Sequence, residues 1–139
     1  MMTATQYLRQ IENYDNRIKN KLIEEEQLSS LSTSVSAIPV GEKVQTSVKR
    51  DPMGDMVAKI FDLREEISKM ISEFLQKKQE IVRTIEQVED PLLYNILFKH
   101  YVEYKSLVRI ADEIGYSEIH MKKHLKALAE VKKIKGFER

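Results

Sequence analysis

SLVRIADEIGYSEIHMKKHLKAL, residues 106–128, is the most informative passage in the chain. It predicts two short helices with a tight turn between them. Ser106 stands where a helix N-cap belongs, because its hydroxyl can accept a hydrogen bond from a free amide of the first turn. Gly115 suits the left-handed turn that ends a helix, and Ser117 can cap the next helix. Between Ser106 and Gly115, apolar residues recur at helical spacing: Leu107, Ile110, Ala111 and Ile114.

The second predicted helix also carries an apolar stripe at helical spacing: Met121, Leu125, Leu128 and Val131. Ala111 is small enough to let this helix cross the first one closely, and Met121 can lock the pair together. This order is the helix-turn-helix arrangement, whose second helix lies in the major groove of DNA. Helical hairpins with a glycine turn also occur without DNA binding, so the charge distribution has to support the motif.

The charges are unevenly divided along the chain, although the formal net charge of its 139 residues is only +1. Residues 90–139 hold ten basic and seven acidic side chains, whereas residues 1–89 hold thirteen and fifteen. Six lysines and two glutamates fall within residues 117–135. The second predicted helix is therefore the basic element, as expected for a helix that docks against DNA.

The predicted DNA-binding residues lie on the outward face of this helix and around the start of the preceding one. Side chains near the start of the second helix are expected to reach bases, and lysines further along to meet phosphates. The free amides at that helix start, with the Ser117 hydroxyl, can hold a phosphate. The full set is Lys105, Ser106, Arg109, Ser117, Glu118, Ile119, His120, Lys122, Lys123 and Lys126.

Two longer helices are predicted upstream. The first spans about Thr5 to Leu31, and the second runs from Met53 to about Glu89, after the helix-start signal Asp51-Pro52. The Ser- and Thr-rich residues 29–52 between them predict a flexible linker. The stripe of the first helix consists of Tyr7, Ile11, Tyr14, Ile18 and Leu22. The stripe of the second consists of Met56, Ile60, Leu63, Ile67, Met70, Phe74, Ile81, Ile85 and Val88, interrupted by Lys77.

A long helix with one apolar stripe needs a partner. The first helix can supply one by folding back antiparallel, and a second copy of the protein can supply another. Asp90-Pro91 marks the next boundary by capping. We therefore expect an all-α protein, with a long antiparallel, coiled-coil-like helical hairpin over residues 1–89 and a compact helix-turn-helix domain over 90–139.

Composition excludes several classes of protein. Without cysteine there is no disulfide framework and no cysteine-based zinc site. No apolar run approaches the roughly 20 residues of a membrane span. The first residues have no apolar core, so we expect no signal peptide. His120 and His124 have the i, i+4 spacing of a zinc site, but no acidic residue follows the pattern of a metalloprotease helix. We expect a cytoplasmic protein without cofactor, metal or enzymatic activity.

The segment from about Asp90 to Leu128 resembles the fourth region of sigma-70-type sigma factors, which reads the −35 promoter element. The matching residues are FKHYVEYKSLVRIADEIGYSEIHMKKHLKAL. The whole layout resembles small phage and prophage transcriptional regulators of Gram-positive bacteria, of the ArpU-like late-gene type. That resemblance implies regulation of phage late genes at promoter DNA in a bacterial host. One departure is His124, which stands three residues after Met121, where the pattern usually has an aliphatic residue.

The hairpin is expected to mediate self-association or contact with RNA polymerase. A dimer, the favoured oligomer, would place two recognition helices on repeated half-sites of double-stranded DNA. Two other functions fit the same layout. One is a small-terminase-like phage DNA-packaging subunit, which would assemble into rings. The other is a coiled-coil adaptor or anti-sigma-like partner that does not read DNA.

Overall fold

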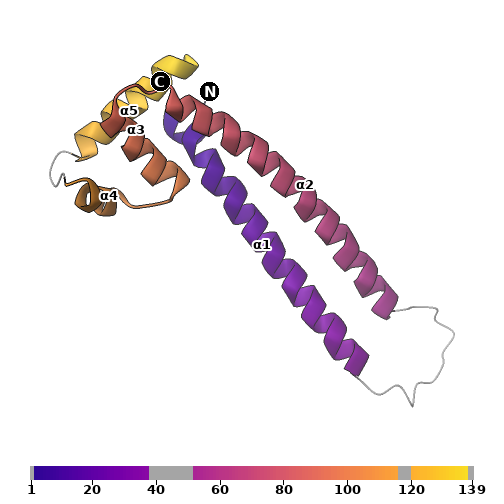
Figure 1. Ribbon diagram of the computed structural model, residues 1–139. Coiled ribbons are helices and arrows are strands. Elements are labelled where there is room, and N and C mark those ends of the chain that lie inside the picture. The colour runs from indigo at the N-terminus through magenta and orange to yellow at the C-terminus, as the bar shows by residue number, and fades with distance from the viewer. Residues whose placement is uncertain (1, 38–51, 116–119, 138–139) are drawn as a thin grey trace, which may run out of the picture. The chain divides into compact units, whose positions relative to one another are not determined.

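The computed structural model describes residues 2–37, 52–115 and 120–137, without the side chains of residues 34–37, 120 and 121. All regular structure in this part of the chain is helical, which confirms the all-α prediction (Figure 1). The elements are α1 (Ala4–Ala37), α2 (Pro52–Glu86), α3 (Pro91–Leu97), the π-helical η1 (Phe98–Val102), α4 (Leu107–Ile114) and α5 (His120–Lys135).

The chain packs as two units. Unit 1 consists of Met1–Asp15 and Glu73–Arg139, and unit 2 consists of Asn16–Ser72. This division differs from the domain boundary predicted at residue 90, because the first turns of α1 and the last turns of α2 belong to the same unit as α3, α4 and α5. Short helices cannot bury a core on their own, and the ends of the two long helices supply the missing apolar side chains.

Unit 2 is a pair of helical segments that run in opposite directions. Lys21 of α1 lies 3.5 Å from Glu66 of α2, and Glu25 is paired with Arg64, so residue numbers rise on one helix as they fall on the other. The buried side chains of this unit include Ile18 on α1 and a pair from α2, Leu63 and Ile67. The predicted α2 stripe therefore faces α1 at these positions.

Two predictions for α1 are wrong. The linker predicted from residue 29 begins later, because α1 continues to Ala37. Within this extension the Thr33 hydroxyl donates to the carbonyl of Ser29 (3.1 Å), so a hydroxyl-rich segment is accommodated by the helix itself. Leu22, assigned to the stripe, is 45% exposed, because Lys21 and Glu25 occupy the interface and pair with α2. Residues 38–51, including the predicted Asp51 cap, lie outside the described residues.

The core of unit 1 combines both long helices with α3, η1 and α5. Fully buried side chains come from four of these elements, Leu8 and Ile11 from α1, Ile81 and Ile85 from α2, Leu97 from α3 and Val131 from α5, and η1 adds the buried Tyr101. Each such side chain contributes on the order of 1.5–3 kcal/mol through burial. The two ends of the long helices are therefore part of the platform that holds α5.

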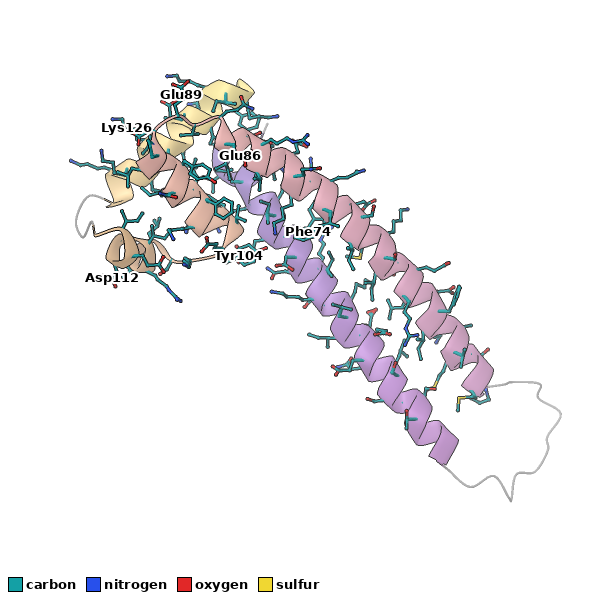
Figure 2. The ribbon with its side chains drawn as sticks, in the orientation of Figure 1. Phe74, Glu86, Glu89, Tyr104, Asp112 and Lys126 are labelled. Carbon is teal, nitrogen blue, oxygen red and sulfur yellow. The ribbon has the colours of Figure 1, made fainter. Side chains whose placement is uncertain are left out.

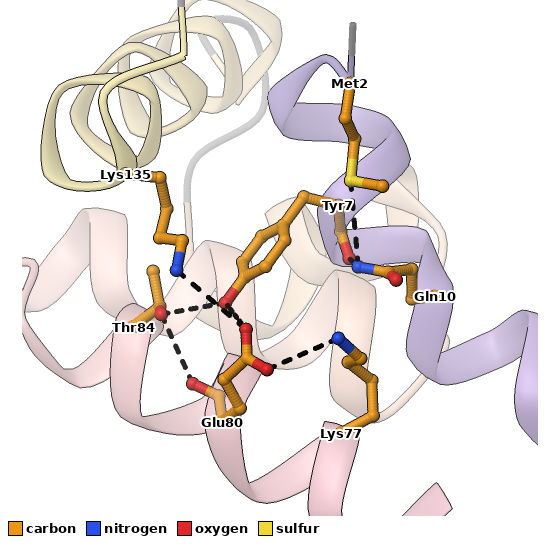
Figure 3. Close-up of polar contacts among 7 residues, drawn as sticks. All are labelled: Met2, Tyr7, Gln10, Lys77, Glu80, Thr84 and Lys135. Atoms are coloured by element: carbon orange, nitrogen blue, oxygen red, sulfur yellow. Dashed lines mark hydrogen bonds and ion pairs between the residues drawn. The ribbon is translucent and has the colours of Figure 1, made fainter. Parts of the chain in front are cut away.

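A polar cluster around Tyr7 joins α1, α2 and α5 (Figure 3). The Tyr7 hydroxyl donates to Glu80 (2.9 Å) and lies 3.0 Å from the Thr84 hydroxyl. Lys77, the residue that interrupts the α2 stripe, pairs with Glu80 at 3.3 Å, and Lys135 of α5 lies 3.9 Å from the same carboxylate. Burial raises the pKa of Tyr7 to about 12, so its hydroxyl stays protonated as a donor.

The boundary between α2 and α3 follows the capping prediction. Helix α2 ends at Glu86, three residues before the expected end, and Asp90 caps α3 by accepting hydrogen bonds from the amides of Leu92 (2.9 Å) and Leu93 (3.4 Å). The chain leaves η1 through Tyr104, which has a left-handed φ of 63°. The Tyr104 hydroxyl donates to Asp15 of α1 (2.8 Å), which ties this strained turn to the rest of unit 1.

Helix α4 has the predicted ends. The Ser106 hydroxyl accepts a hydrogen bond from the Arg109 amide (3.2 Å), and Gly115 ends the helix with a φ of 91° while its amide donates to Ala111 (2.9 Å). Ile110 and Ala111 are buried, as expected for the inward face. The residues of the following turn, 116–119, lie outside the described residues, and the Ser117 cap lies among them.

We expect Gly115→Ala to lower the free energy of unfolding by about 1 kcal/mol, because an L-residue is strained at positive φ. No atom of the described residues lies within 4 Å of the added methyl group, so we attribute the cost to backbone conformation. Urea denaturation measures it. Gly115→Asn is the control and should lose less, since asparagine tolerates the left-handed region better than alanine. Equal losses in the two variants would contradict this origin.

Candidate nucleic-acid interface

Helix α5 packs on α3 and α4 through a face that differs from the predicted one. Its buried side chains are His124, Ala127 and Val131. Leu125, predicted to point inward, is 58% exposed, and Leu128 is half-buried. The assignment of Leu125 is therefore wrong, because the imidazole of His124 takes the inward position one residue earlier. Val131 is buried as predicted, and the side chain of Met121 lies outside the described residues.

The inward position of His124 is explained by two aromatic neighbours. The Tyr101 hydroxyl and His124 Nε2 lie 2.9 Å apart, and the two rings stack with an interplanar angle of 29°. The His100 ring meets His124 edge-on, with centroids 5.1 Å apart. His100 Nδ1 lies 2.7 Å from the Lys105 carbonyl, which can only accept, so this nitrogen carries the proton. His100 thereby also holds the segment before α4.

Burial lowers the pKa of His124 to about 4, and the charges of His100 and Arg9 act in the same direction. The His124 ring is therefore neutral near pH 7 and behaves as a polar core residue. Its inward position also separates it from any zinc site on an outward helix face. Among the described residues, no group of three or more histidine, aspartate or glutamate side chains is placed to hold a metal ion.

The outward face of α5 presents lysines. Lys122 and Lys126 are exposed, and Lys123 is half-buried. Figure 2 shows the position of Lys126 on α5. None of these three ammonium groups forms an ion pair with a side chain in the described part of the chain. Their charges are therefore uncompensated locally and available to an anionic ligand. Of the other predicted residues on this face, Ser117, Glu118 and Ile119 lie outside the described residues, as does the His120 side chain.

The cations around α4 are arranged differently, because they converge on one carboxylate. Glu113 lies 3.1 Å from Lys99, 3.0 Å from Lys105 and 3.4 Å from Arg109. Hydrogen bonds from Lys105 and Lys99 lower the pKa of Glu113 to about 2. Lys105 also pairs with Glu103 at 2.9 Å, and both contacts raise its pKa.

Two of the predicted α4 residues therefore have structural roles. Lys105 is held between two carboxylates, and the Ser106 hydroxyl is engaged as the helix cap. Arg109 keeps a side chain that is 68% exposed and remains accessible to a phosphate. The i, i+4 spacing of Arg109 and Glu113 could have indicated their pairing, whereas the contribution of Lys99 depends on the tertiary packing of η1 against α4.

Two exposed apolar side chains were missed as interface candidates. Val108 on α4 is 67% exposed, and Leu125 on α5 is 58% exposed, three residues after Lys122. Apolar side chains on a helix in the major groove can contact the methyl group of thymine. The departure at His124 was the one signal in the sequence that could have moved Leu125 to the outward face.

The model of one protein family, described as protein of unknown function (DUF1492), matches residues 31–132. The chain belongs to the DUF1492 family. No curated protein and no solved structure matches the chain.

The DUF1492 match includes all of α2, α3, η1 and α4 and most of α5. Every candidate residue from Lys105 to Lys126 lies within the matched segment. None of the described helices has a run of apolar residues long enough to cross a membrane.

Proposed function

We propose that this DUF1492 protein is a sequence-specific double-stranded DNA-binding regulator of transcription, which acts at promoter DNA. The observation that carries the proposal is the contrast between the two adjacent basic groups. The cations around α4 (Lys99, Lys105 and Arg109) pair with Glu113. Lys122, Lys123 and Lys126 of α5 have no ion-pair partner among the described residues. An uncompensated row of lysines on one helix is what phosphate recognition requires.

In this proposal α5 enters the major groove, with its first turn against base edges and its lysines against the flanking phosphates. The exposed Leu125 adds an apolar contact at the bases. Helix α4 crosses the backbone, where Arg109 meets a phosphate. The core residues His124 and Tyr101 fix the rotation of α5 about its axis, and this rotation decides which side chains face DNA.

The biological setting follows from the resemblance to sigma region four and to ArpU-like regulators of phage late genes. The protein would act in the cytoplasm of a bacterial host, without catalysis or cofactor, and RNA polymerase is a second proposed partner. A single small interface with three lysines that have no ion-pair partner among the described residues gives modest affinity. Two copies on repeated half-sites would supply the specificity.

A selection of random double-stranded DNA with the purified protein tests this function. We expect one short sequence, present as two spaced half-sites, to be enriched over successive rounds. The selection repeated with Lys122→Ala/Lys123→Ala controls for retention through other basic surfaces and should enrich nothing. If the unaltered protein retains DNA without any sequence preference, or retains none, the proposed regulator function is wrong.

A further inference from the structure

Helix α2 carries a second row of apolar side chains, apart from the stripe that faces α1. Val57, Phe61, Ile71 and Leu75 are 55%, 61%, 39% and 57% exposed. In the helical period these four residues share one side of α2. Phe61 alone leaves more than half of a surface of about 150–250 Å² in water. A row of this kind on a surface helix marks an interaction site.

The spacing of this row is symmetric. Counted from position 66, Phe61 lies five residues before and Ile71 five residues after. Val57 lies nine residues before the same position and Leu75 nine residues after it. The two polar positions inside the row, Arg64 and Ser68, are symmetric about the same residue. When two such helices lie antiparallel, every apolar residue of one therefore faces an apolar residue of the other.

We propose that two copies of this chain pair through this face of α2, antiparallel and about a two-fold axis that passes between Arg64 and Ser68. Phe61 of each copy would pack against Ile71 of the other, and Val57 against Leu75. An interface with a two-fold axis must be self-complementary, and the symmetric spacing satisfies that requirement. If a different protein bound this face of α2, the spacing of the apolar residues would not need to be symmetric. This pairing rests on the proposed function, which requires two copies, and it specifies the surface through which they associate.

The charge at the centre of the row is compatible with this pairing. Arg64 lies near the proposed axis, where two copies would bring two guanidinium groups together. Its ion pair with Glu25 of α1 compensates that charge within each copy. The four side chains of the row alone cover less area than the roughly 1,200 Å² that specific dimers bury. A contact of this size predicts a dimer that dissociates on dilution.

Sedimentation of the purified full chain without DNA is the first test. We expect a monomer–dimer equilibrium, which Phe61→Glu shifts to monomer at every soluble concentration. Lys59→Glu is the matched control, because it adds negative charge to an exposed site on the opposite side of α2 and should leave the dimer intact. An unaltered protein that stays monomeric, or that forms assemblies of more than about four copies, overturns the proposal.

Cross-linking tests the register, and the chain has no native cysteine to interfere. A copy with Phe61→Cys mixed with a differently tagged copy with Ile71→Cys should form a mixed disulfide dimer with oxidised glutathione. Phe61→Cys alone should not cross-link to itself, because the two sites lie about 15 Å apart along the antiparallel pair, beyond the ~7 Å reach of a disulfide. Self-cross-linking of Phe61→Cys would indicate a parallel pair and overturn the proposal.

These experiments separate the pairing from the DNA-binding proposal. If the chain is monomeric but still selects a DNA sequence, the α2 pairing is wrong and the regulator function stands. If the predicted cross-link forms but no DNA is selected, the regulator function is wrong and the pairing stands.

Discussion

Replacing Lys122 and Lys123 together by alanine is expected to reduce DNA affinity by about tenfold or more at near-physiological salt. Both lysines lie on α5 without an ion-pair partner among the described residues, so their removal takes away charge that only a ligand would neutralise. Each lysine lost from a phosphate contact lowers the slope of log affinity against log salt by about 1. The slope should therefore fall by about 2, which fluorescence anisotropy at several salt concentrations measures.

The matched control is Lys132→Ala/Lys133→Ala, which removes the same charge from the same helix ten residues further on. Lys133 lies 3.7 Å from Glu130, so this pair is partly compensated within the protein. We expect the control to leave the salt slope nearly unchanged. If the two double variants lose affinity and slope equally, DNA is held by the general charge of α5 and not by the proposed face. If neither loses affinity, α5 does not contact DNA.

Acidification from pH 6.5 to pH 4 is expected to cost up to about 3 kcal/mol of stability through His124 alone. The pKa of this buried ring is about 4 in the folded protein, against an ordinary value of 6.5. Above pH 6.5 the ring is neutral in both states, and the contribution of His124 is constant. Below pH 6.5 the imidazole becomes protonated in the unfolded chain but stays neutral in the folded protein. The free energy of unfolding therefore falls until the pH reaches the pKa of His124 in the folded protein, about 4.

The titration of carboxylates affects the stability of the fold in a different, lower pH range. Glu113, whose pKa is held at about 2, loses its contribution only as the pH falls below its ordinary value of 4.5. Urea denaturation at several pH values between 6.5 and 4.5 therefore reports mainly on histidine. His124→Gln keeps a hydrogen-bonding side chain near Tyr101 but cannot titrate, and its stability should change much less across this window. An equally steep pH dependence in that variant would contradict a buried, neutral His124.

The features predicted correctly depend on residues close in sequence. Asp90, Ser106 and Gly115 cap helices within four residues of themselves, and the structure shows all three in those roles. The α2 stripe is long enough for its helical period to be unambiguous. The linker was predicted to start too early because serine and threonine usually favour turns, whereas here Thr33 bonds to its own helix.

The errors arise where a distant residue decides the outcome. The apolar pattern of α5 favoured Leu125 as the inward residue. The ring of Tyr101, 23 residues earlier, offers His124 a buried hydrogen bond that makes the imidazole the better core residue. The ion pairs of Lys105 were likewise not predicted, although its contact with DNA stays a prediction. Packing of η1 beside α4 brings Glu113 to Lys105, and this partner cannot be read from local spacing.

The pattern of residues was therefore enough to predict the all-α class, the caps at Asp90 and Ser106, the glycine end of α4 and the concentration of lysines on the last helix. These properties depend on composition and on hydrogen bonds between near neighbours. Tertiary packing was needed to show which face of α5 is outward, which basic residues pair with carboxylates and which helix ends complete the core of unit 1. Those outcomes depend on contacts between residues far apart in the chain, because a buried polar group goes wherever a partner exists for it.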